Sequence, residues 1–190
     1  MRKLVAGVKI SVDGRIGNPD GYADWVHAWS EDYDLTERID ACVLGGRMYP
    51  GYEQYWIAIR NAPDQPLPMT GRMATAAELE WMHFASKAPH YVLSNRLTEA
   101  QWPNTRFLRN VGEIAALKQQ PGKDIYLMGG AQIISSLLDA GLLDELRLIV
   151  YPLLAGDGRI LFTATQRRGF VLRDTQSLSE GRVRLDYAVA

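Results

Sequence analysis

The chain is poor in cysteine, in surplus charge and in long apolar runs, and each shortage excludes a class of protein. Its single cysteine, Cys42, cannot form an internal disulfide, which is typical of a reducing cytoplasm. The 21 Lys and Arg residues nearly balance the 22 Asp and Glu residues, and no basic stripe indicates nucleic acid or an anionic membrane as a partner. No apolar run is long enough to cross a bilayer, and no signal-peptide core opens the sequence. We therefore expect a cytoplasmic protein that binds neither nucleic acid nor membrane.

Several common site motifs are also missing. No G-x-G-x-x-G follows the first apolar segment, and Gly122-Lys123-Asp124 lacks the glycine-rich run and the Ser or Thr of a Walker loop. No G-x-S-x-G marks a nucleophilic serine. His27, His83 and His90 have no metal-ligand spacing, so we assign each of them to the core or the surface and predict no metal site.

The length and the patterning indicate one α/β domain. A chain of 190 residues with 47% hydrophobic content is expected to fold as a single domain over residues 1–190. Strand-like and helix-like segments alternate, which predicts a largely parallel central sheet with helices on its faces and an antiparallel hairpin at the C-terminal edge. Strands are expected at residues 3–12, 40–44, 88–93, 125–128, 143–151, 170–178 and 182–189. Helices are expected from Pro50, at residues 75–87, at residues 111–119 and between Gly130 and Gly141.

One stretch, residues 124–141, organises the sequence. A short buried strand stops at Gly129-Gly130, and a helix with one apolar face follows. Bare backbone N–H groups at a helix start suit a phosphate, but the same glycines also suit a tight connection between strand and helix. The stretch alone favours neither alternative.

Three of the expected strands end in residues that suit phosphate. They are Gly46-Arg47, Ser94-Asn95-Arg96 and Gly129-Gly130-Ala131-Gln132. Each motif alone is weak, because such residues are also ordinary turn and helix-start residues. Together they offer two cations, a hydroxyl and a helix dipole at the carboxyl edge of the sheet. This combination predicts a nicotinamide dinucleotide with a 2′-phosphate.

Five short segments, in this order along the chain, resemble the dihydrofolate reductase-like superfamily. They are Val-Lys-Ile-Ser-Val-Asp-Gly-Arg-Ile-Gly (8–17), Val-Leu-Gly-Gly-Arg (43–47), Val-Leu-Ser-Asn-Arg (92–96), Tyr-Leu-Met-Gly-Gly-Ala-Gln (126–132) and Asp-Glu-Leu-Arg-Leu (144–148). Within the superfamily, the closer match is to the C-terminal reductase domain of the bifunctional riboflavin-biosynthesis deaminase/reductase and to its stand-alone relatives.

The resemblance implies a three-layer fold around a mixed, mostly parallel eight-stranded sheet, with NADPH as the hydride donor. It implies phosphate contacts from Gly46 and Arg47, and an adenosine end with its 2′-phosphate held by residues 94–96. It further implies a cis peptide between Gly129 and Gly130 and a nicotinamide bordered by the first loop. Relatives are commonly dimers, so a homodimer is implied as well. The implied cofactor residues are Ile16, Gly17, Gly46, Arg47, Met48, Ser94, Asn95, Arg96, Gly129, Gly130, Ala131, Gln132 and Ile133.

The chain departs from its relatives in features that bear on the phosphate contacts, on the substrate and on the deaminase activity. The usual Gly-Arg-x-Thr reads Gly46-Arg-Met-Tyr49, so a hydroxyl contact to phosphate is either lost or made by the phenol. The Pro-Trp-x-Leu-Pro pattern that precedes the pterin-binding acid of dihydrofolate reductases is replaced by the segment at residues 22–26, with Trp25 but no Leu-Pro. The deaminase half is absent, since a single cysteine excludes its zinc site.

Acids near the first strand are the candidates for proton donation. Asp13 ends that strand and is our catalytic candidate, although Asp13-Gly14 is equally a turn sequence. The acidic group Glu31, Asp32 and Asp34 is the other candidate and is also typical of a solvated helix start.

We therefore predict an NADPH-dependent reductase of a small heterocycle of pyrimidine, pterin or flavin-precursor type. The alternatives are a true dihydrofolate reductase and a nucleotide-binding module that has lost catalysis.

Overall fold

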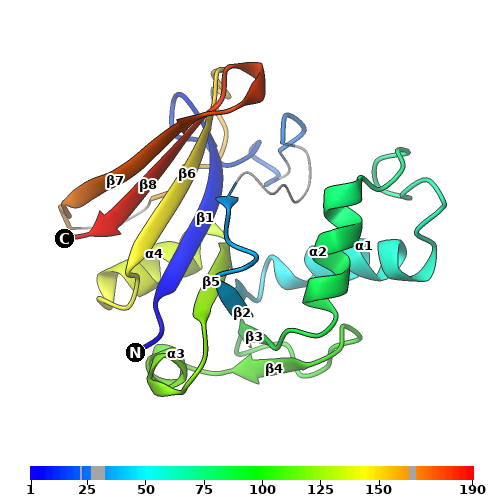
Figure 1. Ribbon diagram of the computed structural model, residues 1–190, viewed down its shortest axis with the longest axis horizontal. Helices are drawn as coiled ribbons and strands as arrows, with labels where there is room; N and C mark the ends of the chain where they lie inside the picture. Colours follow the sequence, from blue (N-terminus) through cyan, green and yellow to red (C-terminus); the bar gives the residue numbers. More distant parts are fainter. Residues whose placement is uncertain (22, 27–32, 163–165) are drawn as a thin grey trace.

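A computed structural model describes residues 1–21, 23–26, 33–162 and 166–190. It contains the α/β fold that the sequence predicts, with one eight-stranded sheet between two layers of helices (Figure 1). The strands are β1 (Leu4–Ser11), β2 (Ile39–Gly45), β3 (His90–Leu93), β4 (Thr105–Leu108), β5 (Asp124–Gly129), β6 (Glu145–Tyr151), β7 (Phe170–Ser177) and β8 (Val183–Val189). The helices are α1 (Tyr49–Asn61), α2 (Ala76–Ala85), α3 (Val111–Gln119) and α4 (Ala131–Asp139).

The strand order is β4-β3-β2-β5-β1-β6-β8-β7. Every neighbouring pair from β4 to β6 is parallel, and β8 runs antiparallel to both β6 and β7. The mixed, mostly parallel sheet and the C-terminal hairpin are thus confirmed. Because five parallel pairs point their carboxyl ends to one edge, segments far apart in the sequence meet there.

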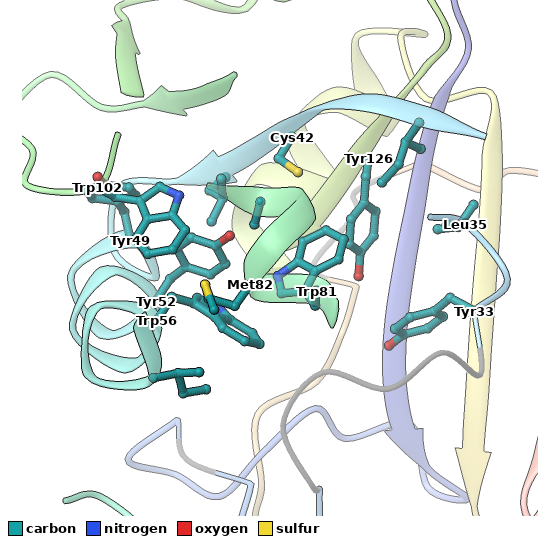
Figure 2. Close-up of a cluster of buried hydrophobic side chains, with 14 of the residues drawn as sticks. Tyr33, Leu35, Cys42, Tyr49, Tyr52, Trp56, Trp81, Met82, Trp102 and Tyr126 are labelled. Atoms are coloured by element: carbon teal, nitrogen blue, oxygen red, sulfur yellow. The ribbon is translucent and has the colours of Figure 1, made fainter. Parts of the chain in front are cut away.

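Each central strand alternates between two cores, as period-2 side-chain geometry requires. In β1, Leu4 and Ala6 pack with α3 and α4, whereas Val5 faces α1 and α2. The core on the α1 and α2 side is rich in aromatic rings, including Tyr52, Trp81 and Trp102, and Cys42 lies among them (Figure 2). Burial raises the pKa of the Cys42 thiol. The expected core role of Cys42 is confirmed.

Local signals set several element boundaries. Pro50 lies in the first turn of α1, where its missing N–H costs nothing. The Thr75 side chain accepts from the Glu78 N–H at 3.2 Å, and Glu78 accepts from the Thr75 N–H at 2.8 Å, which confirms the capping box of α2. Gly141 follows α4 with φ of 68°, a left-handed conformation that favours glycine.

One strand escaped the sequence pattern. β4 has four residues, Thr105–Leu108, and pairs on one side only, with β3. An edge strand this short gives too few alternating positions to detect. The resemblance implied eight strands, whereas the residue pattern alone yielded seven.

Candidate active site

A cleft of about 1690 Å³ opens along the carboxyl edge of the sheet. Its walls come from the ends of β2, β3 and β5, from the segment after β4, and from two loops at residues 15–21 and 157–160. Every predicted cofactor residue except Gly17 lines this cleft. The three strand ends are therefore brought together, as a parallel sheet requires.

The junction of β5 and α4 forms the middle of the cleft. The Gly129–Gly130 peptide bond is cis, as the resemblance implied. Gly129 has φ of 117°, which only glycine adopts readily. A Cβ placed on Gly130 would meet no atom within 4 Å, so the space before this backbone is open. Gly130 is the N-cap of α4 and makes no side-chain cap bond, which leaves the first N–H groups of the helix available to an anion.

The ends of β2 and β3 touch directly through Gly46 and Ser94. A Cβ on Gly46 would lie 2.6 Å from the Ser94 Cβ and 2.7 Å from its hydroxyl oxygen, so only glycine allows this approach. The Ser94 hydroxyl accepts hydrogen bonds from the backbone N–H of Arg96 at 3.2 Å and of Leu97 at 3.1 Å. The hydroxyl that was predicted to bind phosphate thus also shapes its own loop.

Three arginines line the end of the cleft that is formed by the segments after β2, β3 and β4. Arg47 and Arg96 are exposed, and neither guanidinium has a hydrogen-bond or ion-pair partner within the described part of the chain. Arg109, which follows β4, donates from Nη1 to the Leu97 carbonyl at 2.9 Å and to the Ser94 carbonyl. The sequence analysis did not find Arg109, because it did not find β4.

The first loop is bonded along its length to the loop after β6. Ile16 N–H donates to the Arg159 carbonyl at 2.8 Å, and Arg159 N–H donates to the Gly17 carbonyl at 2.7 Å. The Arg159 guanidinium donates to the carbonyls of Pro19 at 3.1 Å and Asp20 at 3.2 Å. Ile16 lines the cleft, whereas Gly17 is buried beneath it and contributes a structural carbonyl.

Asp13 does not line the cleft. Its carboxylate accepts from the Ser11 hydroxyl at 2.5 Å and from the N–H groups of Ala155 and Gly156, both at 3.0 Å. These hydrogen bonds, the Ser11 bond foremost, lower the pKa of Asp13 to about 2. An acid held ionised in this way is a poor proton donor at neutral pH. The contacts of Asp13 are those of a turn residue, which was the alternative interpretation of the Asp13-Gly14 sequence.

Of the three residues in the predicted acidic group, the structure describes one. Glu31 and Asp32 lie outside the described residues, as do Tyr22, His27 and Trp29. Asp34 is described, does not line the cleft, and offers its carbonyl to Arg147 Nη1 at 3.0 Å. The acids of the described cleft wall are Asp20 and Asp157, both exposed and both on loops.

Tyr49, which replaces the usual Thr, points away from the cleft. It is 1% exposed, and its hydroxyl donates to Glu53 at 2.8 Å and bonds the Thr105 hydroxyl at 3.0 Å. The phenol therefore does not replace the missing hydroxyl contact to phosphate. It joins α1 to the edge strand β4 instead.

Away from the three arginines, the wall of the cleft is formed by aromatic side chains. The sequence analysis did not predict this aromatic part of the wall. Tyr52 lies there with its hydroxyl 2.7 Å from His90 Nε2, and His90 Nδ1 lies 2.9 Å from the Ala88 carbonyl. Because Nδ1 donates to that carbonyl, Nε2 accepts from Tyr52. Burial lowers the pKa of His90 to about 4, so the ring is neutral at pH 7. The other aromatic lining residues are Tyr33, Tyr55, Trp56 and Tyr126.

A lysine from β1 completes the lining. Lys9 is 8% exposed, and its Nζ lies 5.9 Å from the centroid of the Tyr33 ring. Within the described residues, no three His, Cys, Asp or Glu side chains are grouped to hold a metal ion. No described helix is long and apolar enough to span a membrane.

Comparison with known proteins gives the family. Residues 2–183 match the RibD C-terminal domain. The chain is 31% identical over 193 residues to the uncharacterized protein YyaP of Bacillus subtilis strain 168, and the match covers 98% of this chain and 94% of YyaP.

Solved structures agree on the fold. A Shewanella sp. PV-4 protein named for riboflavin biosynthesis superposes with a TM-score of 0.71 at 20% identity, over 99% of both chains. The dihydrofolate reductase of Enterococcus faecalis, complexed with NADP(H) and RAB-propyl, gives a TM-score of 0.57 at 16% identity, over 98% of this chain and 96% of that one. With the match across residues 2–183, the chain belongs to the RibD C-terminal domain family, a riboflavin-pathway reductase family with the dihydrofolate reductase-like fold.

Proposed function

We propose that the protein is an NADPH-dependent reductase of a small heterocycle, of the 5-amino-6-(5-phosphoribosylamino)uracil or pterin type. The observation that carries the proposal is the meeting of three phosphate-friendly strand ends in one cleft with three arginines at one end. The family supports a reductase, and NADP(H) is one of the two compounds bound in the Enterococcus faecalis structure with the same fold.

The cleft residues fit a dinucleotide phosphate. The open space before Gly130 and the available N–H groups of α4 suit a pyrophosphate. Arg47 and Arg96, with guanidinium groups that have no partner in the described chain, suit the 2′-phosphate. When bound, NADPH would supply the hydride for the reduction. Ile16 would border the nicotinamide, and the aromatic walls would exclude water around a flat ring.

Cofactor preference tests the phosphate assignment. A charge-assisted contact contributes about 1.5–3 kcal/mol, so Arg96→Ala should weaken NADPH binding by about ten- to a hundredfold. NADH, which lacks the 2′-phosphate, should bind almost unchanged. Titration of both cofactors, followed by nicotinamide fluorescence, measures the two dissociation constants. The NADPH penalty should shrink as salt rises, because the side chain is exposed.

Arg47→Ala is the competing variant, and Arg106→Ala is the matched control. Arg106 is an exposed arginine of β4 that does not line the cleft, so its loss should leave both dissociation constants unchanged. If Arg47→Ala shows the NADPH-selective loss instead, the 2′-phosphate belongs to Arg47. Equal losses for NADPH and NADH in both variants would refute the preference for NADP.

An acceptor panel tests the reaction. We expect NADPH oxidation with a ribosylaminopyrimidine, a flavin or a pterin. Faster turnover of dihydrofolate than of the others would make the protein a true dihydrofolate reductase. NADPH binding without turnover of any acceptor would make it a nucleotide-binding module.

We further propose a cytoplasmic homodimer. The support is β7, an edge strand with Val171 and Leu172 exposed at 45% and 48%, because open apolar edges favour pairing. Sedimentation velocity measures the mass, and a monomer at micromolar concentration would contradict this part of the proposal.

A further inference from the structure

The aromatic part of the cleft wall is built from five rings. They belong to Tyr33, to Tyr52, Tyr55 and Trp56 of α1, and to Tyr126 of β5. We call these five residues the aromatic wall. Tyr55 is half-buried, and each of the other four is at most 6% exposed. Aromatic side chains offer large apolar faces, so this wall favours a flat apolar ligand over a charged one.

Hydrogen bonds hold two phenol groups on the protein side of the wall. The Tyr52 hydroxyl lies 2.7 Å from Nε2 of His90, a fully buried ring. The Tyr55 hydroxyl donates at 2.5 Å to Glu78, which is 1% exposed. Because both partners lie beneath the surface, these hydroxyl groups turn away from the cleft and leave the rings to face it.

Contacts between the rings fix their orientation. Tyr55 and Trp56 meet edge to face, with centroids 5.1 Å apart and an angle of 84° between the rings. The centroids of Tyr52 and Trp56 are 6.0 Å apart, and Figure 2 shows both rings on α1. The Tyr33 and Tyr126 centroids are 6.2 Å apart. Side chains that are already ordered lose little conformational entropy when they bind a ring.

The aromatic wall adjoins the turn that suits phosphate. Met48 lines the cleft and packs against the aromatic core, and its sulfur would lie 3.6 Å from a Cβ built on Gly129. A ligand on the wall would therefore border a cofactor held at the Gly129–Gly130 turn. The cleft volume of about 1690 Å³ exceeds the roughly 300–1,000 Å³ of a usual ligand pocket, so it has room for a cofactor and a second ligand of several rings.

Positive charge in the cleft is concentrated away from the aromatic wall. The three arginines described above line the end formed by the segments after β2, β3 and β4. The two loops of the cleft lining carry two arginines and two acids, namely Arg15, Arg159, Asp20 and Asp157. Their charges balance. Lys9 is 8% exposed and has interactions of its own within the protein.

The guanidinium that contacts the aromatic wall is paired with a buried acid. Arg72 donates from Nη2 to the Tyr55 hydroxyl at 3.1 Å and to Glu78 at 2.7 Å. Its Nη1 donates to Glu78 at 2.7 Å and to the Met73 carbonyl at 3.0 Å. A phosphate beside Tyr55 would therefore meet an ion pair without net charge, and the cost of its desolvation would not be offset.

We infer that the aromatic wall stacks on a fused, uncharged ring of the hydride acceptor, and that the acceptor is a flavin without phosphate rather than a phosphoribosylated pyrimidine. The inference rests on the proposed reductase function and chooses among the acceptors that it allows. An isoalloxazine is flat, uncharged at neutral pH and wide enough to contact several rings of the wall. A pyrimidine is a single ring, and its phosphoribosyl group would have to lie against apolar faces.

The reduction balances with the reduced nicotinamide as reductant. A hydride, with its two electrons, passes to N5 of the isoalloxazine, and the nicotinamide is left oxidised. A proton from solvent adds to N1 and completes the dihydroflavin. The wall residues form no bond in this step. They hold the flavin ring flat beside the nicotinamide and exclude water around it.

Riboflavin and FMN test the charge of the acceptor, because they differ only in a phosphate group. Titration in saturating NADP⁺, which fills the part of the cleft lined by the three arginines and permits no turnover, follows the quenching of flavin fluorescence by the wall. The two dissociation constants should agree within about threefold. A phosphate with a cation partner would make FMN bind about ten- to a hundredfold more tightly. That result, or no binding of riboflavin, overturns the inference.

Variants of Tyr55 test the stacking contact. Tyr55→Ala should weaken riboflavin binding about five- to a hundredfold, the range of one lost stacking contact. Tyr55→Phe removes the same hydroxyl but keeps the ring, so it should keep most of the affinity. Tyr187→Leu is the control and should bind as the wild type does, because Tyr187 is a half-buried ring of β8 outside the cleft lining. Wild-type affinity in Tyr55→Ala, or equal losses in Tyr55→Ala and Tyr55→Phe, overturn the inference.

A series of ring systems tests the wall without any variant. Uracil, lumazine and lumichrome have one, two and three rings and carry no phosphate. Calorimetry should show affinity rising in this order, by about tenfold or more from uracil to lumichrome, because each added ring gains contact with the wall. Equal affinities, or tightest binding of uracil, contradict a wall that selects a fused ring.

Separate outcomes mark the failure of the reductase proposal. If the wild type binds neither NADPH nor NADP⁺, the reductase is refuted, and riboflavin titration of the wild type and the Tyr55 variants decides alone whether the wall binds the ring. If the wild type reduces a phosphoribosylaminopyrimidine with a higher kcat/KM than riboflavin, the reductase stands and the inference of a flavin acceptor is wrong.

Discussion

Replacing Glu78 by Gln removes one negative charge from a carboxylate that is 1% exposed. Arg72 donates to its two oxygens, both at 2.7 Å, and the Tyr55 hydroxyl donates at 2.5 Å. The Thr75 N–H and hydroxyl donate at 2.8 and 3.1 Å. Tyr55 lines the cleft, so this cluster supports the wall of the candidate active site.

The pKa of Glu78 gives the size of the effect. Burial alone would raise it, but the hydrogen bonds from Arg72, Thr75 and Tyr55 outweigh burial and lower the pKa from 4.5 to about 2. At 1.36 kcal/mol for each pKa unit, the folded state favours the ionised form by about 3 kcal/mol. Arg72 is 31% exposed, and solvent screens part of this interaction. We expect Glu78→Gln to lower the free energy of unfolding by about 2–3 kcal/mol at pH 7.

The pH dependence has a definite sign. A carboxyl group with a lowered folded-state pKa stabilises the fold fully above its unfolded-state pKa and loses this contribution as the pH falls through the folded-state value. The difference between wild type and Glu78→Gln should therefore be complete at pH 7 and shrink from about pH 5 towards pH 2.

Urea unfolding at pH 7, 5 and 3, followed by tryptophan fluorescence, measures this difference. Glu80→Gln is the control, because Glu80 is an exposed residue of the same helix and should cost less than about 0.5 kcal/mol. The reasoning fails if Glu78→Gln is no more destabilising than Glu80→Gln at pH 7, or if their difference is constant down to pH 3.

Two further predictions concern the cleft. Gly46→Ala should weaken NADPH binding by about tenfold or more, because its Cβ would lie 2.6 Å from the Ser94 Cβ, and such overpacking costs about 1–3 kcal/mol. Calorimetric titration should show partial recovery in Gly46→Ala/Ser94→Gly and no loss in Gly169→Ala, a position outside the cleft lining where the added Cβ would meet only the Ala190 Cβ, at 3.6 Å. Asp13→Asn should lower the melting temperature but keep the shape of the pH–rate profile, because its carboxylate binds the loop after β6; loss of a titrating limb would identify Asp13 as the proton donor after all.

Local patterns were sufficient for most of the fold. The capping box at Thr75, the proline at the start of α1 and the glycine after α4 all act within a few residues, so the sequence reveals them directly. The meeting of the three strand ends also followed, because it requires only that the strands be parallel.

Features that depend on a distant segment could not be predicted. The orientation of Tyr49 is set by Glu53 and Thr105, and Thr105 belongs to the strand that the pattern missed. Arg109 follows the same strand, so its place beside Arg96 became visible only with the fold. Neither contact could be predicted, because the sequence pattern did not reveal the short edge strand β4.

Lys9 shows why a buried cation is the hardest of these features to read from sequence. In an apolar strand, a single lysine reads equally well as a side chain that extends its stem along the core and keeps its ammonium group in water. Burial at 8% exposure excludes that alternative. Its Nζ lies 5.9 Å from the centroid of the Tyr33 ring, and the side chain lines the cleft. No local pattern around residue 9 predicts this, because the cleft is formed by segments that lie far apart in the chain.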